Sequence, residues 1–331
     1  MYKLTHPLFL LCETPLHAGS GDDLGIVDLP IQRERHTSFP KIESSSLKGA
    51  LREAFEEKCS GTAPFASLDA PDVKVHRIFG FDDGSLEKQT VNRLKNLFKI
   101  KKEDKEQDGT EFAGCLAFSD ARLLLFPVKS MKGVFVWVTC PQVLNKLASD
   151  IELTQRGVLP ALNNLLTLTV DDGNSSVASN NITIGNSIVL EEYAFTANIS
   201  NVVQQFAVEL ADLIFDVPAL EYWKGLLKTN LVVLSNNDFR DFVNQSTEVI
   251  TRTKNDNNTG TVQDGALFTE EYLPTESVLY SLVMASSENR ENSMSETEVM
   301  QFFQDNQPAI FQLGGNASIG KGLLRTKLLK A

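Results

Sequence analysis

The sequence predicts an α+β fold, because strands separated by helices occur at both ends of the chain and a long irregular stretch lies between them. At the N-terminal end, a buried strand is expected at 3–12 and an amphipathic helix at 44–58. At the C-terminal end, a short helix at 296–306 follows a strand at 277–285 and precedes one at 323–329. This order fits a split β-α-β core of the ferredoxin-like type that carries large insertions.

The helix at 44–58 combines an apolar face with a polar N-terminus. The serine triplet Ser44–Ser46 supplies N-cap candidates, and Lys48 and Arg52 are i, i+4 neighbours opposite the apolar stripe. Serines at a helix N-terminus, with two cations one turn further on, would suit a phosphate group. An ordinary solvated helix face fits the same residues, so this helix alone does not decide. The apolar face consists of Leu47, Ala50, Leu51, Ala54 and Phe55.

The remaining elements are expected in the second and last thirds of the chain. Strands at 116–126 and 134–140 are joined by a turn at Lys132-Gly133. A strand-turn-strand pattern at 247–268 predicts a β-hairpin. Between about 150 and 245, helical stretches alternate with loops rich in Asn and Ser, and few boundaries can be placed there.

The composition is that of a globular protein of the cytoplasm. The chain has 331 residues, of which 42% are hydrophobic and 22% charged, enough for a substantial core. Its cysteines never form a C-x-x-C pair, which argues against a zinc site and against a disulfide framework. No apolar stretch approaches the ~20 residues needed to cross a bilayer, so no membrane contact is expected. The four cysteines are Cys12, Cys59, Cys115 and Cys140.

Charge is distributed unevenly along the chain. The formal net charge of −12 is unfavourable for binding nucleic acid. However, residues 31–52 hold five basic and two acidic side chains, and residues 316–331 hold four basic and no acidic ones. Residues 256–305 hold ten acids and a single Arg. This asymmetry favours basic surfaces for nucleic acid, although scattered solvated charge fits it equally well.

A glycine-rich loop lies near the C-terminus. Gly315 to Lys321 satisfies G-x-x-x-x-G-K, the start of a phosphate-binding P-loop. Gly322 replaces the Ser/Thr that would hold magnesium, and the segment that follows reads as a strand instead of a helix, so a nucleotide-hydrolysing enzyme is a remote alternative. Closely spaced glycines still let backbone N–H groups approach phosphates, with Lys321 and Arg325 adding charge. A plain tight turn between strands remains the other interpretation.

The loop from His17 to Arg35 is the best candidate for chemistry. It contains one histidine, three aspartates and three glycines. An aspartate such as Asp28, beside residues that bind a backbone, can ligate a divalent ion at a scissile phosphate or orient an attacking hydroxyl. His17 can act as acid or base near neutral pH. Turn formation is nevertheless the commoner role of an Asp in a Gly-rich loop.

Several motifs in order along the chain resemble a known family. H-x-G-S-G-x-x-x-G-x-V-D-x-P-I-Q-R-E-R spans His17–Arg35, and S-S-L-K-G-x-L-R spans Ser45–Arg52. Three further motifs follow along the chain. Arg122–Val138 matches R-L-L-L-F-P-V-K-S-x-K-G-V-F-x-W-V, Glu270–Pro274 matches E-E-Y-L-P, and Gly314–Gly322 matches G-G-N-x-x-I-G-K-G. Together they resemble the RAMP superfamily of CRISPR proteins, specifically the repeated backbone subunit of type III-B RNA-guided effector complexes. Ala317-Ser318 departs from the Glu-Thr expected in many relatives, which weakens any side-chain role there.

The resemblance implies a single RAMP domain over residues 1–331, with a ferredoxin-like (RRM-like) palm and a β-hairpin thumb. The palm is expected from about 1–60, 110–140 and 270–331, with insertions at about 61–110 and 141–246 and the thumb at about 247–268. Copies of such a subunit stack along a guide RNA and cut single-stranded target RNA at regular intervals. The cut requires a divalent metal, Mg²⁺ or Mn²⁺.

By motif position, the resemblance makes Asp28 the catalytic and metal-binding aspartate and His17 a second catalytic residue, with Glu270 and Tyr272 in support. The implied partners are guide RNA, target RNA, further copies of the chain and other type III-B subunits. A non-catalytic scaffold that only polymerises on the guide is the alternative. Arg252 and Lys254 are expected near the tip of the thumb. The other expected RNA-binding residues are Gln32, Arg33, Arg35, Ser45, Ser46, Lys48, Arg52, Gly314, Gly315, Lys321 and Arg325.

Overall fold

The computed structural model describes residues 3–21, 25–60, 65–81, 92–94, 97, 112–154, 159–256, 259–288 and 293–329. The expected insertion at 61–110 therefore lies mostly outside the described residues. Its described part includes α2 (Pro71–Phe79) and β3 (Gly80–Phe81), which pairs with β4 (Phe112–Ala113). In the described part of the chain, no helix is both long enough and apolar enough to cross a membrane.

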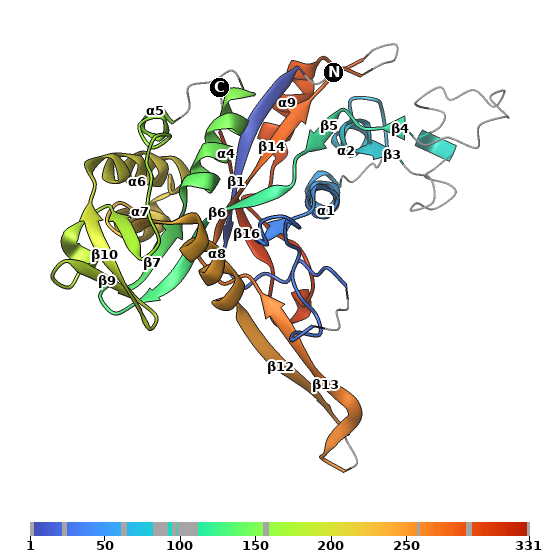
Figure 1. Cartoon of the computed structure of the whole chain (residues 1–331). Coiled ribbons are helices and arrows are strands. Elements are labelled where there is room, and N and C mark those ends of the chain that lie inside the picture. The colour runs from blue at the N-terminus through green and yellow to red at the C-terminus, as the bar shows by residue number, and fades with distance from the viewer. Residues whose placement is uncertain are drawn as a thin grey trace.

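The centre of the molecule is an antiparallel sheet whose strands come from both ends of the chain (Figure 1). β1 (Leu4–Cys12) lies between β14 (Val278–Ala285) and β16 (Leu323–Leu328), and β14 is followed by β5 (Leu116–Phe118) and β6 (Ala121–Ser130). The three strands predicted at the ends of the chain are thus confirmed, and the one expected at 116–126 is divided into β5 and β6. Two short strands extend the sheet, β15 (Ile310–Gln312) beside β16 and β2 (Lys41–Ile42) beside β6.

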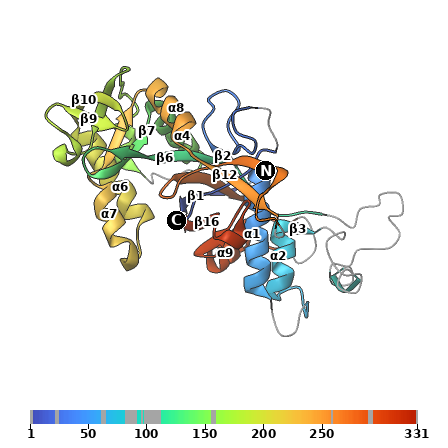
Figure 2. The same cartoon turned by 90° about the horizontal axis from the view of Figure 1, so that it is seen from below.

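Helices α1 (Ser44–Cys59) and α9 (Glu296–Asn306) pack beside α2 on one face of this sheet (Figure 2). Their apolar faces meet through aromatic rings: Phe55 of α1 stacks on Phe303 of α9, with ring centroids 5.3 Å apart. Both predicted helices are confirmed. Each forms because it carries an apolar stripe of helical period that is buried against the sheet.

The prediction of a serine N-cap for α1 is wrong. The N-cap residue is Glu43, and it makes no side-chain capping bond. The Ser44 N–H instead donates to Asp120 Oδ1 at 2.9 Å, and Lys41 Nζ donates to Asp120 Oδ2 at 2.9 Å. A carboxylate from the turn between β5 and β6 therefore occupies part of the positive end of the helix.

The middle of the chain, which the sequence left unassigned, forms a closed barrel with part of the central sheet. β6 runs from the central sheet into the barrel, whose strand order is β6, β7, β11, β8, β10, β9, and the β6–β9 pair Ser130–Leu190 closes it. The remaining barrel strands are β7 (Val134–Thr139), β8 (Asn174–Val177), β9 (Ser187–Leu190), β10 (Tyr193–Ile199) and β11 (Leu231–Leu234). The helices of this part are α4 (Pro141–Glu152), α5 (Pro160–Asn163), α6 (Asn201–Ile214), α7 (Glu221–Leu227) and α8 (Asn236–Gln245).

A two-stranded hairpin projects from the body of the molecule (Figure 1). It consists of β12 (Glu248–Asn255) and β13 (Val262–Tyr272), with Thr251 opposite Thr269. The hairpin predicted at 247–268 is confirmed, but β13 runs further, to Tyr272. The expected turn at its tip includes residues 257–258, which lie outside the described residues. The root of the hairpin thereby reaches the E-E-Y motif.

Candidate functional site

Three segments that are far apart in the sequence meet at the root of the hairpin. Leu16 forms a β-bridge with Leu273, and Leu29 forms one with Glu270, so the loop after β1 runs along the end of β13. The glycine-rich loop joins them, because the Gly315 N–H donates to the His17 carbonyl at 2.9 Å. The motifs that the sequence analysis singled out separately are therefore parts of one site.

Asp28 is exposed and is held by a single residue of β13. The Thr269 N–H and the Thr269 hydroxyl each donate to Asp28 Oδ2 at 2.8 Å, and the same hydroxyl accepts from the Asp28 N–H at 3.0 Å. These bonds lower the pKa of Asp28, the backbone N–H contributing most. Among the described residues, no donor is bonded to Oδ1, so this oxygen is available to a ligand.

His17 is buried, with 9% of its surface exposed. Its Nδ1 lies 2.7 Å from the Glu271 carbonyl oxygen. A carbonyl oxygen only accepts, so Nδ1 carries the proton and Nε2 is the ring nitrogen left for another role. Its ring centroid lies 5.5 Å from that of Tyr272. His17 therefore orders the junction between its own loop and β13.

Glycines permit this packing around His17. A Cβ on Gly19 would lie 2.8 Å from His17 Nε2, and a Cβ on Gly314 would lie 2.2 Å from the His17 carbonyl oxygen. Gly314 also has a φ of +85°, which favours glycine. The two glycine-rich segments are thus required for close backbone approach at the site.

A polar network lies beside Asp28 and His17. Tyr272 donates from its hydroxyl to Glu270 Oε2 at 2.7 Å, and Arg252 donates to Glu270 Oε2 at 3.0 Å and to the Tyr272 hydroxyl at 2.8 Å. Asn316 Nδ2 donates to the Tyr272 hydroxyl at 2.8 Å and to Glu270 Oε1 at 3.1 Å. Lys321 Nζ lies 5.0 Å from the centroid of the Tyr272 ring, a cation–π geometry.

The network keeps the Glu270 carboxylate ionised. Burial would raise its pKa, but the hydrogen bonds from Tyr272, Asn316 and Arg252 outweigh burial and lower the pKa of Glu270. Arg252 was expected near the hairpin tip, and this expectation is corrected: its side chain reaches the root of the hairpin, where these acceptors lie. Lys254 lies further out on β12 and is exposed.

Two of the expected RNA-binding residues are committed to contacts within the protein. Arg33 donates to the backbone carbonyls of Ser38 and Val243 at 2.8 and 3.0 Å, and it pairs with the Glu271 carboxylate. Gln32 accepts from the Glu43 N–H at 2.7 Å and thereby ties the loop to the start of α1. These side chains fix the loop in place. The neighbouring Arg35, by contrast, is exposed.

The polar face of α1 borders an open groove of about 420 Å³. Ser45, Lys48 and Arg52 line it together with residues of the β3–β4 pair and of β5. Lys48 Nζ donates to the Leu116 carbonyl at 3.1 Å, and burial, followed by the nearby Arg52, lowers the pKa of Lys48. The structure therefore gathers three of the predicted phosphate-binding side chains on one groove. The half-buried Ser46 accepts from Gln32 Nε2 at 3.4 Å.

The glycine-rich loop is not a nucleotide-binding P-loop. After a single short turn at Ala317–Ile319, the chain continues into the strand β16, as predicted, and not into a helix. A Cβ on Gly322 would lie 2.0 Å from the Leu313 carbonyl oxygen, so this glycine serves close packing. Arg325 in β16 forms an ion pair with Glu13.

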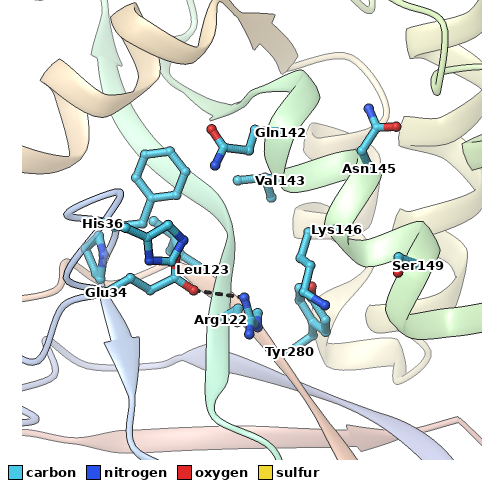
Figure 3. Close-up of a pocket in the computed structure, with 12 residues that line it drawn as sticks. Glu34, His36, Arg122, Leu123, Gln142, Val143, Asn145, Lys146, Ser149 and Tyr280 are labelled. Carbon is cyan, nitrogen blue, oxygen red and sulfur yellow. Dashed lines mark hydrogen bonds and ion pairs between the residues drawn. The ribbon is translucent and has the colours of Figure 1, made fainter. Parts of the chain in front are cut away.

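A second cavity, of about 470 Å³, lies between the 34–40 loop and α4 (Figure 3). No residue of the predicted site lines it. Two of its charged groups bond to each other, since Arg122 donates to Glu34 at 3.0 Å. The Tyr280 hydroxyl in its lining donates to Asp150 at 2.9 Å. The cavity is therefore separate from the site at the hairpin root.

The site contains two positions that the sequence analysis did not identify, Thr269 and Asn316. Both are adjacent to recognised motifs, since Thr269 directly precedes E-E-Y and Asn316 is the Asn of G-G-N. Their roles depend on partners elsewhere in the chain, because Asp28 lies 241 residues from Thr269 and Glu270 lies 46 residues from Asn316.

The described residues do not form a closed cage for a metal ion. Among them, no group of three or more His, Cys, Asp or Glu side chains is placed to hold one. Mg²⁺ is commonly bound by one or two carboxylates together with substrate phosphates. Asp28, exposed and with Oδ1 available, fits this type of site.

The fold and the site together define a class of protein. Residues 9–325 match the RAMP superfamily, and the chain belongs to that superfamily. Within it, the chain is of the type III-B Cmr4 type: it is 32% identical over 318 residues to the CRISPR system Cmr endoribonuclease Cmr4 of Pyrococcus furiosus. That match covers 95% of this chain and 92% of the relative. The resemblance stated from the motifs is thereby confirmed.

Solved structures have the same fold. Oligomeric Cmr4 from Pyrococcus furiosus matches with a TM-score of 0.65 at 24% identity, covering 99% of this chain and 98% of that one. A chain of the type III-B Cmr-beta complex bound to cognate target RNA matches with a TM-score of 0.70 at 20% identity, covering 99% and 98%. At this level of identity, the likeness concerns the mixed α/β fold of the RAMP type.

Proposed function

We propose that the chain is the backbone subunit of a type III-B CRISPR effector complex in the cytoplasm. It polymerises along the guide RNA and cleaves complementary target RNA at regular intervals in a divalent-metal-dependent reaction. The observation that carries this proposal is the exposed Asp28 carboxylate, fixed at the root of a projecting hairpin beside His17 and the Glu270–Tyr272 network. Relatives named as an endoribonuclease, as oligomeric and as bound to target RNA support it.

In this proposal the central sheet is a ferredoxin-like palm. Its elements have the chain order β-α-β-β-α-β, with β5 and β6 counted as one strand: β1, α1, β5/β6, β14, α9 and β16. In the sheet they lie in the order β16, β1, β14, then β5 and β6, with antiparallel neighbours. This order supports the proposal that the palm consists of two interleaved β-α-β units. The hairpin β12–β13 is then the thumb that wedges into the guide–target duplex.

The guide RNA is held by its backbone. The groove beside α1 presents Lys48 and Arg52, and the glycine-rich loop adds Lys321. Phosphate contacts of this kind carry no sequence information. A subunit that serves guides of any sequence requires this property, and base pairing then supplies the specificity.

The residues of the site have different roles in the proposed reaction. The lowered pKa of Asp28 makes it a carboxylate at neutral pH and a poor general base, which favours a role in binding or orienting. A divalent ion bound by Asp28 would stabilise negative charge at the scissile phosphate. The substrate's own 2′-hydroxyl is the available nucleophile when the backbone is held in line. His17 and the network around Glu270 hold Asp28's loop against β13.

One experiment separates this proposal from the non-catalytic scaffold. The complex is assembled with guide RNA and incubated with labelled complementary RNA and Mg²⁺ or Mn²⁺. Products at regular spacing, lost on chelation of the metal, support the nuclease. Complementary RNA that is bound and stays intact supports the scaffold.

A further inference from the structure

Thr269 makes a closed set of bonds with Asp28 that no other side chain in the described residues makes. Its hydroxyl accepts from the Asp28 N–H at 3.0 Å and donates to Asp28 Oδ2 at 2.8 Å. Its own N–H donates to the same oxygen at 2.8 Å. Only a hydroxyl side chain can accept and donate in this way, because a single atom serves as both donor and acceptor.

The backbone on either side reinforces the same junction. The Leu29 N–H donates to the Thr269 carbonyl at 3.0 Å, and the Glu271 N–H donates to the Leu29 carbonyl at 3.0 Å. Residues 28–29 therefore run alongside Thr269 to Glu271 like an added strand. Any displacement of β13 at this point displaces the Asp28 carboxylate as well.

We infer that Thr269 is the positioning residue for Asp28, fixing Oδ2 so that Oδ1 faces the RNA. The inference deepens the proposed function and rests on it. Thr269 lies on the hairpin itself, opposite Thr251. Thr269 thus joins the hairpin that is proposed to engage the duplex to the carboxylate that is proposed to act on it.

The test compares Thr269→Val with Thr269→Ser in the assembled complex. Valine has the shape of threonine without the hydroxyl, and serine retains the hydroxyl. Single-turnover cleavage and target RNA affinity are measured for both. Loss of an outer partner of a metal ligand commonly costs about 10–100-fold in activity. We therefore expect Thr269→Val to slow cleavage about tenfold or more with target affinity unchanged, and Thr269→Ser to restore the rate.

The dependence of cleavage on metal concentration provides a readout specific to the position of the Asp28 carboxylate. Thr269→Val should need a higher Mg²⁺ or Mn²⁺ concentration for half-maximal cleavage than wild type, because Oδ2 loses its bond from the hydroxyl. Thr269→Ser should retain the wild-type metal dependence. Thr196→Val, an exposed threonine of β10 in the barrel, is the matched control for the same substitution.

The outcomes separate this inference from the proposed function. Wild-type cleavage by Thr269→Val, or an equal loss in Thr269→Ser, overturns the positioning role while Asp28→Asn in the same assay still reports on the nuclease. A loss of cleavage that is matched by a loss of target affinity also overturns it. Normal cleavage by Asp28→Asn overturns the inference together with the catalytic role of Asp28, whereas a wild-type complex that leaves bound complementary RNA intact overturns the proposed function.

Discussion

Arg33 and Glu271 form an ion pair that joins the N-terminal loop to the root of the hairpin, with side-chain exposures of 20% and 6%. Glu271 also accepts from the Ile31 N–H at 3.0 Å and from the Thr247 hydroxyl at 2.8 Å. The pair thus lies where the loop, both hairpin strands and α8 meet. A residue predicted to hold RNA is, in the structure, one that holds the site together.

Arg33→Ala is expected to destabilise the fold. It leaves the buried Glu271 carboxylate without its cation, which commonly costs about 3–5 kcal/mol for a buried pair. Arg35→Ala, two positions along and exposed, should change the free energy of unfolding by less than about 0.5 kcal/mol. Urea denaturation of the two variants checks this. Equal stabilities would mean that the Arg33–Glu271 pair contributes nothing.

Two glycine-to-alanine substitutions are expected to have opposite effects on stability. Gly314→Ala forces a Cβ to within 2.2 Å of the His17 carbonyl oxygen at a φ of +85°. Conformational strain alone costs about 1–3 kcal/mol. Gly49→Ala, in the middle of α1 with nothing within 4 Å, should stabilise by about 1 kcal/mol. Thermal unfolding of both variants measures the signs, and a stable Gly314→Ala protein would contradict the close approach at His17.

Glu270 is expected to make stability depend on acid pH. Its folded-state pKa is lowered from the ordinary 4.5, so it contributes stability that is present above this value and lost as the pH falls through its folded-state pKa. Glu270→Gln removes that contribution. The difference in unfolding free energy between wild type and variant should therefore be largest near neutral pH and shrink in acid. A difference that stays constant from neutral pH into acid would contradict the charged network.

Lys254→Ala is expected to weaken RNA binding without regard to sequence. Lys254 is exposed on the projecting hairpin, where it can contact phosphates. Losing one phosphate contact should reduce the slope of log affinity against log salt by about 0.7–0.9. Filter binding of two unrelated guide–target pairs over a salt series measures this. Lys58→Ala, an exposed lysine in the last turn of α1, is the control and should keep the wild-type slope.

The sequence predicted the elements whose signals are local. α1 and α9 were predicted because their apolar residues recur with helical period, and the hairpin because turn residues separate two strands. The barrel was not predicted, because its closure depends on the pairing of Ser130 with Leu190 and on no local pattern.

The sequence predicted which residues belong to the site, but it did not predict which of them contact one another. Glu270, Tyr272, Lys321 and Asp28 were each identified from motifs, and the structure brings them to one junction. The N-cap of α1 was wrong because Asp120, 76 residues from Ser44, supplies the carboxylate. A local sequence pattern cannot predict a hydrogen-bond partner that lies so many residues away in the chain.

Cleavage of complementary RNA by the assembled complex carrying Asp28→Asn tests most directly whether Asp28 acts in the reaction. The substitution keeps the size of the side chain and removes the carboxylate charge. We expect regularly spaced cleavage to be abolished while target RNA binds with nearly wild-type affinity. Regularly spaced cleavage that survives Asp28→Asn would contradict this expectation.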